Sequence, residues 1–319
     1  MIGARALIQT LVDSGVDVCF MNPGTSEMHF VHELDAVPQM RGVLALFEGV
    51  ATGAADGYAR MTGRAAAVLL HLGPGLGNGL ANLHNARRAH SPVVAIVGAH
   101  ATYHEHYDAP LQSDIESVAR NVSGWYRASA FSRDVGRDVA AAVAASLQPP
   151  GQVVTLVVPA DVSWSEGAVP ARPRALPPAQ PVDNEAVDQA AAVLTSQEPT
   201  LLLLGGAGTR EPGLRAASRI CAATGAQMLG EVFPARQPRG AGVPPLERLA
   251  YLAEAAQKQL QGVQHIVLAG ARSRAIVHSA CGCKGSCRRL AGTTLAGRGR
   301  RSQRRVRWAG PGRSPRRFR

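Results

Sequence analysis

The sequence predicts an α/β protein: a parallel doubly wound sheet domain, then a second, truncated Rossmann-like α/β domain and an irregular basic tail. Helical and strand-like segments alternate along the first half of the chain. The predicted strands are continuous apolar runs, as expected of parallel strands that helices cover on both faces. A proline-rich stretch then separates this alternation from a second one. The 319 residues suffice for about two domains, and 46% hydrophobic against 18% charged residues excludes a disordered chain.

In the first half, apolar residues at helical spacing predict helices over residues 4–12, 49–61 and 135–147. Short apolar runs predict five strands, namely Val16–Met21, Val43–Phe47, Ala66–Leu72, Val93–Val97 and Val153–Val158. A glycine-rich turn is predicted over Gly73–Gly79, followed by a helix to about Arg88. Strands that alternate with helices in this way are typical of a parallel sheet with right-handed crossovers.

Residues 166–181 contain five prolines and no apolar periodicity, so we predict a linker there. It separates a domain over residues 1–165 from a partial central domain over residues 182–271. In the latter, helices are expected over 184–195, 213–224 and 246–260, and strands over 201–204 and 266–268. The periodic pattern stops at residue 272, which suggests that this second domain loses its last third.

The net charge of +11 comes from the tail over residues 272–319, which holds 15 of the 34 Lys and Arg residues and no Asp or Glu. Residues 1–271 are mildly acidic. A basic arm that binds nucleic acid is one interpretation of the tail. We favour the other, a frameshifted or disordered stretch, because the composition changes abruptly within a domain. His278, Cys281, Cys283 and Cys287 do not match common zinc spacings, and no metal site is expected.

The composition also bears on location. No apolar run approaches the roughly 18 residues of a membrane span, and no secretory signal is apparent near the N-terminus. Five cysteines give no even disulfide framework. We therefore expect a cytoplasmic protein that contacts no membrane.

Glu48 is the most informative single residue, because its neighbours from Val43 to Ala55 are apolar, glycine or threonine. It lies where a predicted strand ends and a helix begins, and open α/β sheets bind ligands at that edge. Burying a carboxylate costs several kcal/mol unless it has a partner. The simpler interpretation is an acid in the first helical turn, stabilised by the helix dipole.

Two glycine-rich segments follow predicted strands, but neither fits a dinucleotide-binding loop. The G-x-G-x-x-G pattern fails at Gly73 because Asn78 occupies its last position, and at Gly75 because Leu80 does. Gly205–Gly208 lacks the third glycine. A nicotinamide cofactor is therefore not expected.

Several motifs together resemble one enzyme family. They are Phe47-Glu48-Gly49 with the following Ala54–Arg60, the turn Asn22-Pro23-Gly24-Thr25, Gly73-Pro74-Gly75 with Asn78, and Ser91–Val94. This combination resembles the pyrimidine-binding domain of thiamine-diphosphate enzymes, in the branch of acetolactate synthase large subunits and benzoylformate decarboxylase. The resemblance extends to about Ala271, and the acetolactate synthase-like group is the nearest match.

The resemblance implies roles for these residues. In that family the glutamate matched to Glu48 hydrogen-bonds the cofactor's aminopyrimidine and supports deprotonation of its thiazolium ring. His71 matches a histidine of the benzoylformate decarboxylase branch, and Gln112 matches a glutamine of the acetolactate synthase branch. The pocket would be lined by Asn22, Pro23, Gly24, Thr25, Pro74, Gly75 and Asn78. The implied reaction is decarboxylation of a 2-oxo acid followed by carboligation.

Two departures from the family pattern concern the cofactors and partners. The family binds the diphosphate through Mg²⁺ on a C-terminal domain marked by Gly-Asp-Gly, which is absent from this sequence. The family's site forms between subunits, so a homo-oligomer or a complex with a full-length paralogue is implied, and this chain would be catalytically incomplete alone. FAD, which acetolactate synthases bind, is left open. The alternatives are a simple 2-oxo acid decarboxylase and a non-catalytic partner or nucleic-acid-binding protein.

Overall fold

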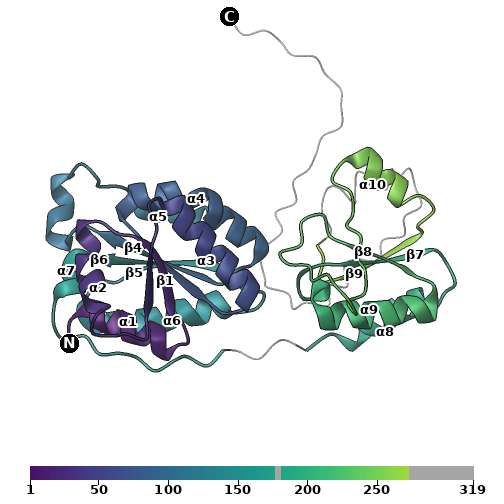
Figure 1. The fold of residues 1–319 in the computed structure, drawn as a ribbon, viewed down its shortest axis with the longest axis horizontal. Coiled ribbons are helices and arrows are strands. Elements are labelled where there is room, and N and C mark those ends of the chain that lie inside the picture. Colours follow the sequence, from purple (N-terminus) through teal and green to yellow (C-terminus); the bar gives the residue numbers. More distant parts are fainter. Residues whose placement is uncertain (177–180, 273–319) are drawn as a thin grey trace, which may run out of the picture.

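The computed structural model describes residues 1–176 and 181–272, and two parallel sheets organise them (Figure 1). This architecture confirms the predicted fold class of a larger and a smaller parallel α/β sheet. The predictions for the basic tail, including its cysteines and His278, lie outside the described residues. No helix in the described ranges is both long enough and apolar enough to cross a membrane.

The larger sheet has six strands in the order β2-β1-β3-β4-β6-β5, and every neighbouring pair is parallel. The strands are β1 (Val18–Asn22), β2 (Arg41–Leu44), β3 (Ala66–Leu70), β4 (Val93–Ala99), β5 (Trp125–Ala128) and β6 (Val153–Pro159). β3, β4 and β6 are buried along their whole length, in line with their unbroken apolar sequences. The chain order reverses between β1 and β3, so the carboxyl ends of these two strands form a topological switch point.

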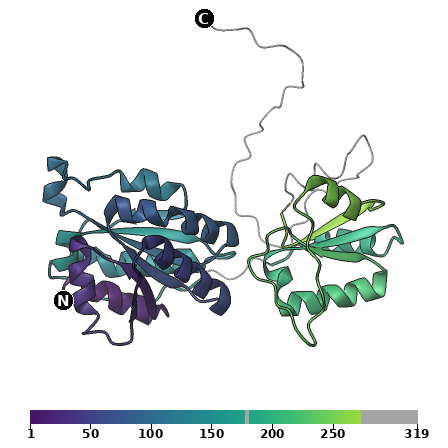
Figure 2. The ribbon, with the colours of Figure 1, turned by 45° about the horizontal axis from the view of Figure 1, so that its top comes forward.

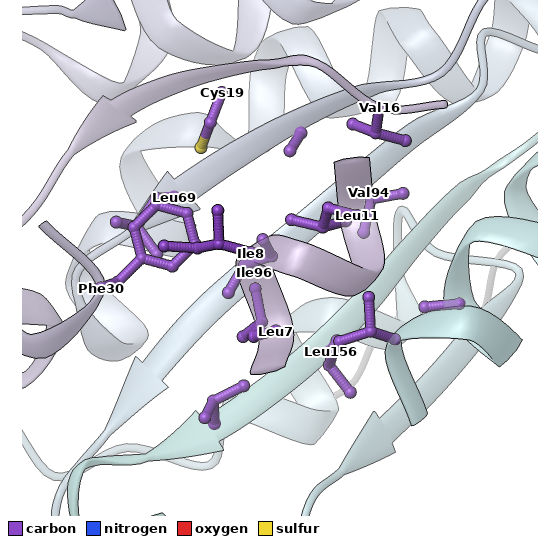
Figure 3. Close-up of a cluster of buried hydrophobic side chains, with 14 of the residues drawn as sticks. Leu7, Ile8, Leu11, Val16, Cys19, Phe30, Leu69, Val94, Ile96 and Leu156 are labelled. Carbon is purple, nitrogen blue, oxygen red and sulfur yellow. The ribbon is translucent and has the colours of Figure 1, made fainter. Parts of the chain in front are cut away.

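Helices cover both faces of this sheet (Figure 1). One layer consists of α1 (Gly3–Asp13), α2 (Met28–Glu33), α6 (Val135–Leu147) and α7 (Ala160–Trp164). The other consists of α3 (Glu48–Thr62), α4 (Leu72–Ala89) and α5 (Ile115–Arg120). Under the first layer, Leu7, Ile8 and Leu11 of α1 pack against strand residues such as Ile96 and Leu156 (Figure 3). Apolar burial at about 25 cal/mol per Å² is the main stabilising contribution in such a core.

The smaller sheet has the order β8-β7-β9 and forms a separate lobe (Figure 2). Its strands are β7 (Thr200–Leu204), β8 (Gln227–Gly230) and β9 (His265–Ala269), with helices α8 (Asn184–Leu194), α9 (Glu211–Thr224) and α10 (Ala253–Gln259). Two arginines of this lobe reach the first one. Arg210 donates to the carbonyl of Arg60 at 3.4 Å, and Arg236 donates to that of Met61 at 2.7 Å, so both satisfy carbonyls at the C-terminus of α3.

Three sequence predictions need correction. Residues 43–47 were expected to be a strand buried on both faces, but β2 is a short edge strand that is largely exposed. The predicted glycine-rich turn over Gly73–Gly79 is the beginning of α4. The helix expected over 246–260 is confined to α10, because the segment before it follows an irregular path. Two further strands, β5 and β8, were not predicted from the sequence.

Candidate functional site

The carboxyl ends of the central strands meet at one edge of the larger sheet. Asn22, the last residue of β1, pairs with Leu70 at the end of β3, and Met21 pairs with Leu44 at the end of β2. The segments that follow these strands therefore gather around the switch point. They carry most of the residues that the sequence singled out, from Asn22 to Thr25, Glu48, and from His71 to Asn78.

Glu48 is the first residue of α3 and lies half-buried at this edge. Its Oε2 accepts a hydrogen bond from Nδ2 of Asn78 on α4, at 3.1 Å. A Cβ atom added to Gly75 would lie 3.4 Å from Oε1 of Glu48 and 3.5 Å from Cβ of His71. The backbone of Gly75 thus lies beside both Glu48 and His71, and Asn78 of the same helix bonds to Glu48.

The turn after β1 lies against the side chain of His71. Nδ2 of Asn22 donates to the carbonyl of Ala45 at 2.8 Å, which ties the segment leading to Glu48 to the end of β1. A Cβ on Gly24 would lie 2.4 Å from Nδ1 of His71, so only glycine allows the imidazole to lie against this turn. Pro23 is half-buried, whereas Thr25 is exposed where a short 3-10 helix begins.

His71 connects β3 to α4 and owes its position to an unusual backbone. The next residue, Leu72, has a φ of +54° although it is a buried leucine. Non-glycine residues held in this left-handed region cost of the order of 1–3 kcal/mol and persist where the surroundings impose them. This turn directs the polypeptide straight into α4, so Gly73, Pro74 and Gly75 lie in the helix's first turn beside His71.

Glu27, which the sequence analysis did not single out, is a buried member of this cluster with 3% of its surface exposed. Its Oε2 lies 2.7 Å from Nδ1 of His71 and accepts the backbone N–H of Gly24 at 2.8 Å. Burial raises the pKa of the Glu27 carboxyl, against the opposing effects of the Gly24 N–H and of His71. In the sequence, Glu27 resembles an ordinary acid at the start of a helix, because it follows a Pro-Gly turn by three residues. Its partner His71 is 44 residues away, so no local pattern indicates the pairing.

The raised pKa of Glu27 predicts a pH-dependent stability. The folded state binds the carboxyl proton more tightly than the unfolded chain does. The favourable contribution of this proton to the free energy of unfolding is therefore complete below the ordinary pKa of 4.5, and it is lost as the pH rises through the pKa of the folded state. We expect the free energy of unfolding of the wild-type chain to fall relative to that of Glu27→Gln as the pH rises above 4.5. Urea unfolding of both proteins from pH 4 to about 8 measures this difference. A difference that moves in the opposite direction would contradict the prediction.

Gln112 has no direct link to the other predicted site residues through its side chain. It is half-buried, and its neighbour Ser113 packs against α4, where a Cβ on Gly73 would lie 2.3 Å from the serine Oγ. The Gln112 backbone N–H bonds to the carbonyl of Ala109, and its side chain makes no hydrogen bond with Glu48 or His71. In the described part of the chain, no group of three or more His, Cys, Asp or Glu side chains is arranged to hold a metal ion.

The chain is similar to known proteins, most extensively in its N-terminal part. Residues 1–120 match the family described as thiamine pyrophosphate enzyme, N-terminal TPP binding domain. The chain is 65% identical over 278 residues to a Mycobacterium tuberculosis protein named "Putative acetolactate synthase large subunit IlvX", which covers 86% of this chain and 52% of the relative. It is also 34% identical over 155 residues to benzoylformate decarboxylase of Pseudomonas aeruginosa, or 48% of this chain and 29% of that protein.

Solved structures agree with this fold. A thiamine diphosphate-dependent 4-hydroxybenzoylformate decarboxylase of Rhodococcus jostii superposes with a TM-score of 0.73 over 84% of this chain and 51% of that one, at 24% identity. This likeness concerns the fold alone. The chain spans about half the length of the M. tuberculosis relative and of the R. jostii enzyme.

Proposed function

Because residues 1–120 match the family of N-terminal TPP-binding domains of thiamine pyrophosphate enzymes, we propose that the edge around Glu48 binds the aminopyrimidine ring of thiamine diphosphate. The function proposed for the complete protein is acetolactate synthase-like decarboxylation of a 2-oxo acid followed by carboligation. The carboxylate of Glu48, half-buried at the switch point and bonded to Asn78, is the observation that carries this proposal.

The residues present fit a flat, nitrogen-containing ring. Gly75 carries no side chain beside Glu48 and His71. A carboxylate accepts hydrogen bonds and exchanges protons, which suits a ring nitrogen of a basic heterocycle. The Pro23-Gly24 turn and Pro74 border the same region with rigid backbone. The carboxylate of Glu48 is thus the acceptor that we propose for the pyrimidine half of the cofactor.

Thiamine diphosphate, when bound, supplies a carbon nucleophile that attacks 2-oxo acids and an electron sink for their decarboxylation. The part of Glu48 is to hold and move a proton at a ring nitrogen of the pyrimidine. Asn78, through its bond to Oε2, orients the Glu48 carboxylate so that Oε1 faces the space beside Gly75. His71 lies on the other side of that space, where it can exchange a proton with the substrate.

A simple 2-oxo acid decarboxylase of the benzoylformate type is the second candidate. It is favoured by the imidazole of His71 at the site and by the similarity to the Pseudomonas decarboxylase. Product analysis separates the two candidates, because carboligation yields a 2-hydroxy-2-alkyl-3-oxo acid or a hydroxyketone, whereas simple decarboxylation releases an aldehyde.

The diphosphate and Mg²⁺ have no ligands assigned among the described residues, and the sequence contains no Gly-Asp-Gly. We propose that a second subunit supplies them, as the resemblance implies. The residues Leu44, Leu46, Phe47 and Val50 are close to Glu48 in the sequence, and their side chains are 50–95% exposed, which places apolar surface near the site. We propose a second copy of the chain as its occupant, and sedimentation velocity tests whether the chain self-associates. FAD is not assigned to any residue.

The proposed pyrimidine site can be tested by filling it. The Gly75→Ala substitution should stabilise α4 by about 0.5–1 kcal/mol, because alanine loses less conformational entropy in a helix than glycine. The added methyl would nevertheless enter the space beside Glu48, so binding of 4-amino-2-methylpyrimidine should weaken, as measured by saturation-transfer NMR. Gly77→Ala is the matched control, since its Cβ has no neighbour within 4 Å and it lies on the same helix. Equal binding by both variants would overturn the location of the site.

A further inference from the structure

Glu27 and His71 form a buried pair that the proposed role of Glu48 leaves unused. The Glu27 carboxylate lies beneath the imidazole, against Gly98 of β4, where an added Cβ would be 1.6 Å from Oε1. Three glycine and backbone features therefore make room for this pair: Gly24 beside the imidazole, Gly98 beside the carboxylate, and the left-handed turn at Leu72. Together these features accommodate the carboxylate of Glu27 next to His71.

The two carboxylate oxygens of Glu27 differ in their partners. Oε2 accepts the Gly24 N–H and lies 2.7 Å from Nδ1 of His71. Oε1 is buried and has no hydrogen-bond partner in the described part of the chain. A backbone N–H can only donate, so Oε2 must be an acceptor. In the arrangement that we consider, Oε2 accepts from both the Gly24 N–H and Nδ1–H of His71.

We infer that Glu27 is a positioning residue that fixes His71 in the tautomer with hydrogen on Nδ1, so that Nε2 is the atom that exchanges a proton with a 2-oxo acid substrate. In neutral His71, Nε2 then carries the lone pair, and protonation adds a hydrogen there without disturbing the bond to Glu27. The side chain of His71 is 21% exposed, whereas that of Glu27 is 2% exposed, so the imidazole alone meets the substrate.

This inference rests on the proposed function only for the identity of the substrate. The tautomer itself is a property of the free chain, so it is measured without cofactor or turnover. Nitrogen-15 shifts and two-bond couplings of the histidine rings distinguish Nδ1–H from Nε2–H, and the His71 signals are assigned by their loss in His71→Gln. The protein for this experiment is the whole 319-residue chain.

Three variants make the test decisive. Glu27→Gln keeps an acceptor for Gly24 and for Nδ1–H, so His71 should retain the wild-type tautomer. Glu27→Met has similar size but no acceptor, and His71 should shift to the Nε2–H form that predominates for a free imidazole. Glu33→Met is the matched control, because Glu33 is also buried but pairs with Arg5 instead of His71, so the tautomer should be unchanged.

An Nε2–H tautomer in the wild-type chain would overturn the inference by itself, even if Glu27→Met failed to fold. An unchanged tautomer in a folded Glu27→Met variant would also overturn it. Neither result would affect the role proposed for Glu48, which is tested by pyrimidine binding. Conversely, a fixed Nδ1–H tautomer in a chain that binds no pyrimidine would leave the pairing intact and refute the cofactor site.

Discussion

Replacement of Glu48 by glutamine is expected to reduce thiamine-diphosphate-dependent turnover of 2-oxo acids by about 10²–10⁴-fold, the usual contribution of one acid-base group. Glutamine has nearly the same size and can still bond with Asn78, but it cannot exchange a proton with a ring nitrogen. Release of CO₂ in the presence of thiamine diphosphate and Mg²⁺ measures the effect. The assay is made on a full-length relative that keeps a glutamate at this position, because this chain is expected to be catalytically incomplete alone.

The fold should tolerate this substitution. Glu48 begins α3, so losing its charge removes a favourable interaction with the helix dipole of about 0.3–1 kcal/mol. Glu211 occupies the same position at the start of α9 in the smaller lobe, and Glu211→Gln is therefore the matched control. This variant also loses the exposed ion pair of Glu211 with Arg215, worth about 0.3–0.5 kcal/mol, so it should show a slightly larger loss of stability and unchanged turnover. Near-normal turnover of Glu48→Gln would leave Glu48 as an ordinary first-turn acid.

The sequence predicted the buried elements of the larger sheet closely. The helix expected over residues 135–147 has those bounds, and β3, β4 and β6 begin at the predicted residues. Each of these elements buries an apolar run or an apolar stripe, and the spacing of apolar residues along the sequence indicates such burial directly. The position of Glu48 at the carboxyl edge of the sheet follows from the same pattern, because strand ends and helix starts locate that edge.

The remaining features depend on contacts between distant segments. Apolar residues over 43–47 suggested a strand covered on both faces, but β2 is an edge strand and several of these side chains are exposed beside the site. Hydrophobicity alone does not distinguish burial in a core from exposure at a surface. The glycines of α4 suggested a turn, yet they allow close packing on α3. A Cβ on Gly79 would lie 2.8 Å from Cγ2 of Thr52. The pairing of Glu27 with His71 has no local signal.

Asp56 shows that a family motif can have a structural role instead of a catalytic one. It lies in the Ala54–Arg60 segment that supported the resemblance, and it is buried, with 7% of its surface exposed. Its Oδ1 accepts from Nε of Arg60 at 2.8 Å and from Oγ of Ser91, and its Oδ2 accepts from Nη2 of Arg60 at 2.6 Å. Asp56 thus joins α3 to the segment that leads into β4.

Asp56→Ala is therefore expected to lower the free energy of unfolding by about 3–5 kcal/mol, because it leaves a partly buried guanidinium and a buried hydroxyl without their acceptor. Urea unfolding measures this loss. In a double-mutant cycle with Ser91→Ala, the two changes should not be additive, since they share one hydrogen bond. Additive effects, or a loss below about 1 kcal/mol, would show that the motif's aspartate does not hold α3 to β4. Glu48→Gln should lose chemistry and keep the fold, whereas Asp56→Ala should lose stability first, which separates the two functions of one motif.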